Sequence, residues 1–265
     1  MANDLTIQPT QSLGLNSTTQ DDSLGIDRAF IISMARIPVL ALVWVAAAYA
    51  GHAIWELVAP AADAATPSTM PNLGPIVVIC IGMILAAVID GWAFKVPNWL
   101  TLSLVVSGWY LGILHDCGIG IDAGIGGFGS ALLGTALGFV LLFPMLFIQG
   151  MGQGDVKMQM GFGAWVGAYF GIATGSTVIL TAFCIGALVG GVFGLVMMAL
   201  RRQFYKNAEN FHAIMVDLQT LMTEGPSKAA DRANARRPFW VRLPYGVPLC
   251  IGFIGYLWYR LVLSA

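Results

Sequence analysis

Seven long apolar runs are the feature of this 265-residue chain that most constrains its fold. The hydrocarbon core of a bilayer is about 30 Å thick, and about 20 helical residues cross it. The runs are continuous rather than alternating, which favours helices over a transmembrane barrel. We therefore predict an all-α integral membrane protein, a polytopic bundle of about seven transmembrane helices, at residues 33–57, 73–93, 99–114, 128–148, 156–172, 175–199 and 244–263.

Composition supports a membrane protein and excludes two other classes. Apolar residues make up 57% of the chain and charged residues only 10%, against about 25% charged in an average soluble domain. A soluble protein of this size would need more polar surface, and a disordered chain would be poorer in apolar residues. The net charge of −1 gives no electrostatic footprint for nucleic acid. We expect the lipid bilayer as a partner and no nucleic acid.

The distribution of Lys and Arg predicts the orientation of the spans. The loop at 201–243 is rich in both residues, whereas the loops at 58–72 and 115–127 contain neither. Because Lys and Arg accumulate on the cytoplasmic side of membrane proteins, 201–243 is predicted to be cytoplasmic. Six predicted spans precede this loop, an even number, so the N-terminus is also placed in the cytoplasm, and the polar residues 1–30 are predicted to form a flexible cytoplasmic tail.

Glycines four residues apart recur in three of the predicted spans. This spacing stacks them on one helix face, where neighbouring backbones can approach closely. We expect these positions to pack helices into a tight bundle: Gly134 and Gly138 in one span, Gly163, Gly167 and Gly171 in the next, and Gly186, Gly190 and Gly194 in the third.

Two carboxylates within the apolar runs are the candidate catalytic residues. Ionisable groups in membrane spans are costly and usually functional. Asp90 closes the second run and Asp155 opens the fifth, and both fall at predicted cytoplasmic helix ends. A single Asp at a helix end is often only a cap or a solvated boundary residue. Two such residues at matched depth in one bundle favour a shared site.

A pair of close carboxylates offers acid–base chemistry without a metal or a covalent intermediate. The two groups cannot both be ionised cheaply, so they share a proton. The ionised member can take a proton from water while the neutral member donates to a peptide carbonyl, as in aspartic proteases. Gly152 and Gly154 would let a peptide approach closely. Lys157 is expected to pair with lipid phosphate or to bias the pair electrostatically.

These motifs resemble the type IV prepilin peptidase family, the GxGD-type aspartic peptidases of bacterial and archaeal membranes. The segment MGQGDVKMQMGFGAWVG at 151–167 looks like the signature of the family. Asp90, followed by Lys95-Val-Pro97-Asn98-Trp-Leu-Thr-Leu, is similar to its first aspartate and the basic Pro-Asn stretch after it. LPYGVPLCIG at 243–252 resembles a Pro-Tyr-Gly element near the last helix.

The resemblance implies that Asp90 and Asp155 are the catalytic pair. Gly152, Gly154 and Lys157 would shape the site, with possible support from Lys95, Pro97 and Asn98. The implied activity is removal of a short leader from type IV or Flp-type prepilins at the cytoplasmic face of the bacterial inner membrane, with no cofactor and no metal. Residues 73–265 would form the peptidase core of six helices, and 31–72 would add an extra N-terminal span and outer loop.

Paired C-x-x-C motifs, which bifunctional family members carry in a methylating domain, are missing here. The chain therefore looks like the peptidase-only branch, similar to peptidases that serve Flp/Tad pili. The resemblance does not indicate which pilin is cleaved, and the oligomeric state stays open.

Three other functions remain as alternatives. A presenilin-like intramembrane protease usually pairs GxGD with a Tyr-Asp motif, but Ile89 precedes Asp90 here. A proton-coupled membrane transporter would place its acids near the bilayer midplane at broken helices, whereas these acids lie at predicted helix ends. A non-catalytic subunit of a secretion machine is not excluded by spacing.

Overall fold

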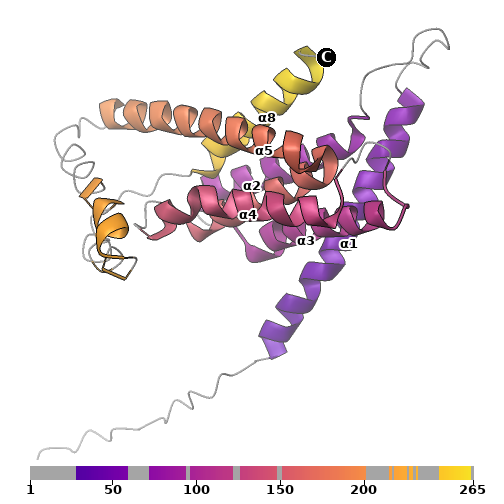
Figure 1. Cartoon of the computed structure of the whole chain (residues 1–265), viewed down its shortest axis with the longest axis horizontal. Coiled ribbons are helices and arrows are strands. Elements are labelled where there is room, and N and C mark those ends of the chain that lie inside the picture. Colours follow the sequence, from indigo (N-terminus) through magenta and orange to yellow (C-terminus); the bar gives the residue numbers. More distant parts are fainter. Residues whose placement is uncertain are drawn as a thin grey trace, which may run out of the picture.

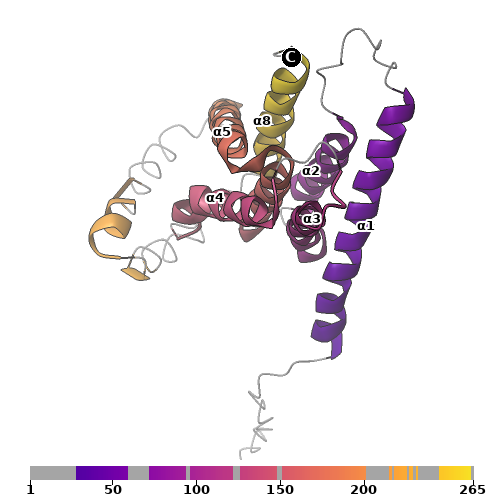
Figure 2. The same ribbon diagram turned by 45° about the vertical axis from the view of Figure 1, so that its right-hand side comes forward.

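The computed structural model describes residues 28–58, 72–93, 96–121, 126–147, 151–200 and 245–263, with short stretches at 215–216, 218–225, 227–228 and 231. Every regular element within these ranges is a helix, so the all-α prediction is confirmed. Figures 1 and 2 show the helices α1 (Arg28–Val58), α2 (Gly74–Ala93), α3 (Asn98–Asp116), α4 (Phe128–Phe147), α5 (Gln153–Leu200) and α8 (Gly246–Trp258), the last extended by a π-helical end at Tyr259–Leu263.

Within the described ranges, four stretches are both long enough and apolar enough to cross a bilayer: Met34–Val58, Gly74–Ala93, Phe128–Leu146 and Gln153–Met197. The chain is therefore a multi-pass membrane protein. α3 is long enough but not apolar enough, because polar and amphipathic side chains interrupt it. α8 is too short, since it has 13 residues. The total of seven spans stays a prediction, and so does the flexible tail, since residues 1–27 lie outside the described part of the chain.

α5 folds back on itself at Gly171. The backbone there has φ 70° and ψ 170°, a conformation that glycine adopts without strain. A Cβ atom at Gly175 would lie 3.2 Å from the carbonyl oxygen of Val166, although nine residues of straight helix span about 13 Å. The two halves of α5 thus correspond to the ranges 156–172 and 175–199, which were predicted as separate helices.

Glycines bring α4 against the first half of α5. Side chains at Gly134 and Gly163 would each run into the other's carbonyl oxygen, so the two backbones touch at these positions. One turn further on, a Cβ atom at Gly138 would lie 2.6 Å from the carbonyl oxygen of Gln159. This face has the close-packing role that the four-residue spacing predicted.

Glycines also bring α8 against the second half of α5, but only at two of the three predicted positions. A Cβ atom at Gly186 would lie 3.2 Å from Leu249, and one at Gly190 would lie 3.2 Å from the Tyr245 ring. By contrast, no described atom lies within 4 Å of the position of a Cβ at Gly194. Gly194 therefore has no packing role within the described bundle, because α8 begins only at Gly246 and does not extend along α5 to that level.

We expect Gly163→Ala to destabilise the protein and Gly194→Ala not to do so. The methyl group at residue 163 would overlap backbone of α4, which cannot move as a flexible side chain does, and overpacking of this kind costs about 1–3 kcal/mol. At residue 194 the methyl group meets no described atom within 4 Å and raises helix propensity. Unfolding of the purified variants in the same detergent measures both effects, and equal stabilities would contradict the proposed packing.

Candidate active site

Asp90 and Asp155 lie at the same end of the helix bundle. Asp90 is close to the last residue of α2, and Asp155 is in the first turn of α5. The starts of two further helices meet here, because Lys157 of α5 binds Asn98 of α3 and Asp90 binds Gly246 of α8. Both acids are buried, with 6% of Asp90 and 4% of Asp155 exposed. The structure therefore brings together the two acids that the sequence singled out.

Asp90 is held by the first residue of α8. The backbone N–H of Gly246 donates a hydrogen bond of 3.0 Å to Asp90 Oδ2, in a buried contact that joins residues 156 positions apart. A free N–H is available here because the first N–H groups of a helix have no partner within it. The contact also needs glycine, since a Cβ atom at residue 246 would lie 2.8 Å from the same carboxylate oxygen.

Asp155 is held by the glycine-rich turn that precedes α5. The backbone N–H of Gly152 donates a hydrogen bond of 3.2 Å to Asp155 Oδ2. Gly154 lets this turn approach the segment before α3, because a Cβ atom there would lie 3.1 Å from Val96 Cβ. Gly152 and Gly154 thus position Asp155 through backbone contacts. From the sequence, these two glycines were expected to let a peptide approach closely.

The two carboxyl groups interact with each other and have no cationic partner among the described residues. Asp90 acts electrostatically on Asp155, and neither carboxylate forms an ion pair within the described ranges. Asp155 Oδ1 is buried and has no hydrogen-bond partner there. Since two close buried carboxylates cannot both be ionised cheaply, the pair is suited to sharing one proton.

Lys157 and Asn98 form a contact that the sequence did not predict. Lys157 Nζ donates a hydrogen bond of 2.8 Å to Asn98 Oδ1 and so joins the start of α5 to the start of α3. Pro97 precedes α3 with an extended backbone, and its carbonyl oxygen accepts the N–H of Leu100 at 3.1 Å. Lys95, the remaining predicted support, lies outside the described residues.

We expect Lys157→Met and Asn98→Ala to impair turnover by similar amounts, and the double variant to be little worse than either. The reason is that both single changes remove the same hydrogen bond, so their effects are not additive. A double-mutant cycle on kcat/KM measures this coupling. Purely additive losses would show that Lys157 acts elsewhere, for example on lipid phosphate.

Three residues that contact or adjoin the acid pair had no predicted role. Gly246 and its neighbour Tyr245 belong to the noted Pro-Tyr-Gly element, but its position beside Asp90 depends on how α8 packs. Tyr245 is close enough to Asp155 for an electrostatic interaction. Gln159, four residues after Asp155, is fully buried with an unpartnered side-chain amide. Its polar side chain within an apolar run was the available signal.

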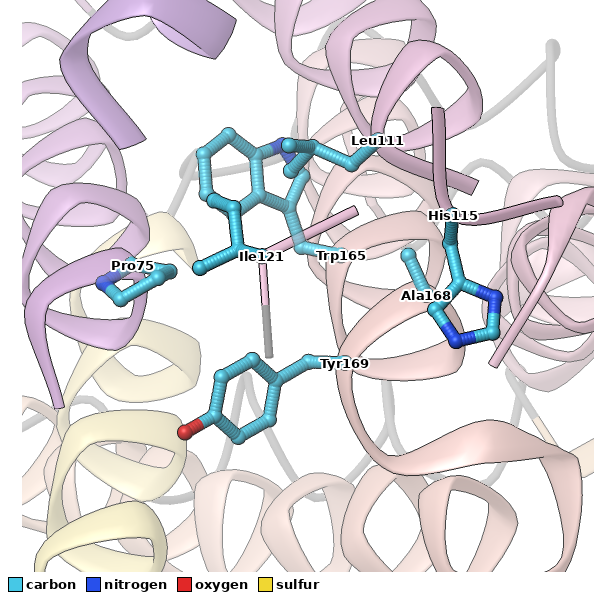
Figure 3. Close-up of a pocket in the computed structure, with 7 residues that line it drawn as sticks. All are labelled: Pro75, Leu111, His115, Ile121, Trp165, Ala168 and Tyr169. Atoms are coloured by element: carbon cyan, nitrogen blue, oxygen red, sulfur yellow. The ribbon is translucent and has the colours of Figure 1, made fainter. Parts of the chain in front are cut away.

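A small pocket lies at the other end of the bundle. Tyr169 donates its hydroxyl to the carbonyl oxygen of Asn72, just before α2 begins, whereas Asp90 is near the end of that helix. Figure 3 shows the residues that line this pocket of about 30 Å³: Pro75, Leu111, His115, Ile121, Trp165, Ala168 and Tyr169. It includes neither acid. Among the described residues, no group of three or more His, Cys, Asp or Glu side chains is placed to hold a metal ion.

Comparison with known families matches the helices that carry the acid pair. Residues 77–195 match the model of the type IV leader peptidase family. This part of the chain is similar to type IV leader peptidases. The matched range contains Asp90 and Asp155, together with Lys157 and Asn98. It excludes Gly246, so one contact of the acid pair comes from outside the part that matches the leader peptidase family.

Two curated proteins that this chain resembles have the same description. The chain is 25% identical over 189 residues to the "Prepilin leader peptidase/N-methyltransferase" of Aeromonas salmonicida strain A449. The same values apply to the protein of that description from Aeromonas salmonicida. The alignment covers 64% of this chain, and the chain spans 60% of the length of the curated relatives that it matches. No solved structure matches the chain.

Proposed function

We propose that the protein is a membrane aspartic endopeptidase that removes the leader peptide of type IV or Flp-type prepilins at the cytoplasmic face. The observation that carries this proposal is the buried pair Asp90 and Asp155, brought together by α2, α5 and α8 without a cationic partner among the described residues. The match of residues 77–195 to the type IV leader peptidase family and the name of the curated relatives support the substrate.

The proposed mechanism uses the single proton shared by the acid pair. The ionised carboxylate takes a proton from water as the water oxygen bonds to the peptide carbonyl carbon, and the neutral carboxyl donates its proton to the carbonyl oxygen. The proton taken from water then passes to the peptide nitrogen, and the C–N bond breaks. At the same time one hydroxyl of the intermediate returns a proton to the carboxylate that had donated its own, so the pair again holds one proton. The products are the leader with a new carboxyl group and the mature pilin with a new amine.

The proposed topology has seven spans, a cytoplasmic N-terminus and the acid pair facing the cytoplasm of a bacterial cell. The concentration of Lys and Arg in 201–243 supports this orientation. Trp92 is 88% and Trp99 49% exposed at the end of the bundle that holds the acids. Since Trp is enriched where membrane meets water, the pair would lie at the interface, within reach of a leader in the cytoplasm.

Leader removal by the purified protein in lipid tests the proposal. Incubated with candidate Flp-type prepilins, wild type should release the leader and leave the mature N-terminus unmethylated, as intact mass measurement shows. Chelators should leave the rate unchanged, because the acid pair supplies both proton transfers. Absence of cleavage of any prepilin, or strong inhibition by a chelator, would contradict the proposed function or its mechanism respectively.

A further inference from the structure

Gln159 is a buried polar residue without a hydrogen-bond partner in the described part of the chain. Its exposed fraction is 0%, and neither Nε2 nor Oε1 of its side chain is paired. Buried amides are normally hydrogen-bonded, so each exception requires an explanation. The surrounding stretch of α5 is otherwise apolar, since Met158 and Phe162 are also fully buried.

The position of Gln159 links it to the acid pair. It follows Asp155 by four residues in α5, so the two side chains lie on the same helix face one turn apart. Long side chains in a helix incline toward its N-terminus, which for Gln159 is the direction of Asp155. Asp155 Oδ1 is also buried and unpartnered. Three unpartnered polar atoms therefore lie on one helix face: a carboxyl oxygen, an amide oxygen and an amide nitrogen.

These atoms match the hydrogen-bonding capacity of water. Asp155 Oδ1 and Gln159 Oε1 can each accept one hydrogen of a water molecule, and Gln159 Nε2 can donate to one of its lone pairs. Three bonds are typical of a buried water in a protein. The second lone pair stays available to attack a carbonyl carbon. A peptide backbone fits less well, because Gln159 is fully enclosed and an extended chain would have to separate the helices.

We propose that Gln159, together with Asp155 Oδ1, binds the water molecule that attacks the peptide bond. This inference rests on the proposed function and adds a residue to its mechanism. The water passes one hydrogen to the ionised member of the acid pair while its oxygen bonds to the carbonyl carbon. The amide of Gln159 exchanges no proton and orients the water.

Replacement of Gln159 by Leu and by Met tests the inference. Both variants keep the approximate volume of the side chain and remove its hydrogen bonds, and Met serves if the branched Leu does not fit. With a prepilin as substrate, we expect kcat to fall by about 10- to 100-fold, the range for loss of a positioned reactant. We expect KM to stay within twofold. Thermal stability should not decrease, since an unpaired buried amide is removed.

The controls separate this inference from the proposed function. Gln219→Leu makes the same change at an exposed position and should leave kcat and KM unchanged. Wild type and Asp155→Asn are assayed together: an inactive wild type would refute the proposed function itself. If wild type cleaves and Asp155→Asn does not, then an unchanged kcat in both Gln159 variants would overturn the inference. So would a raised KM with unchanged kcat, which indicates peptide binding, or a lowered melting temperature with unchanged kcat, which indicates a structural role.

Discussion

Asp90→Asn and Asp155→Asn are each expected to lower the rate of leader removal by about 10³-fold or more while the protein still folds. An amide has nearly the same shape as a carboxyl group, and its oxygen can still accept the N–H of Gly246 or Gly152. It cannot exchange a proton at this site, and loss of general acid–base catalysis of this kind costs about 10²–10⁴ in rate. Because both proton transfers need the pair, each single change should be nearly as damaging as the double change.

Asp116→Asn is the matched control for these two variants. Asp116 ends α3 at the opposite end of the bundle, and its Oδ2 accepts the N–H of Phe128 at 2.8 Å. The same substitution there should leave turnover unchanged. Expression of wild type and the three variants with a candidate pilin, followed by measurement of leader removal, distinguishes the outcomes. Wild-type rates in either Asp90→Asn or Asp155→Asn would show that the acid pair is not catalytic.

Gly246→Ala is expected to have the second largest effect, a loss of kcat of about 100-fold. A methyl group at residue 246 would lie 2.8 Å from Asp90 Oδ2 and 3.1 Å from Asp90 Cβ, so the carboxylate or the start of α8 has to move. The hydrogen bond that holds Asp90 would be lost or bent. Misplacement of a catalytic group by about 1 Å costs roughly 10² in rate.

Gly255→Ala provides the control on the same helix. No described atom lies within 4 Å of a Cβ atom at Gly255, so this substitution should change neither folding nor turnover. The two variants are compared with wild type for kcat and for thermal stability in the same lipid. Full activity of Gly246→Ala would mean that the contact between α8 and Asp90 does not determine the geometry of the acid pair.

The sequence predicted most helix positions because a bilayer requires continuous apolar runs with satisfied backbone hydrogen bonds. The predicted span 73–93 corresponds to the observed helix Gly74–Ala93, and the predicted span 128–148 corresponds to Phe128–Phe147. The first helix begins at Arg28 rather than at 33, since a helix can extend into water beyond its apolar run. The reversal in α5 was expected after residue 172 and occurs at Gly171, where the backbone conformation, and not hydropathy, determines the turn.

The partners of the acid pair could not be predicted because they depend on packing between helices that are distant in sequence. Asp90 itself stood out as a charge in an apolar run, yet its hydrogen bond to Gly246 exists only because α8 packs beside α2. Lys157 carried no signal that it would bind Asn98 rather than lipid. Similarly, the four-residue spacing predicted close helix packing at Gly194 just as it did at Gly186 and Gly190. At Gly194, however, no packing partner is found within the described residues.

The distance between residues 90 and 155 tests the central claim, that two acids meet at one end of the bundle. Spin labels at Asp90→Cys and Asp155→Cys, with the native Cys80, Cys117, Cys184 and Cys250 replaced by Ala, report this distance in lipid. A reference pair uses Asp90→Cys with native Cys117, which follows α3 at the opposite end.

Because α3 has 19 residues, or about 28 Å of helix, the reference distance should be near the thickness of the bilayer core. The account predicts a much shorter distance between labels at 90 and 155. A 90–155 distance as long as the reference would place the acids on opposite membrane faces and contradict the account.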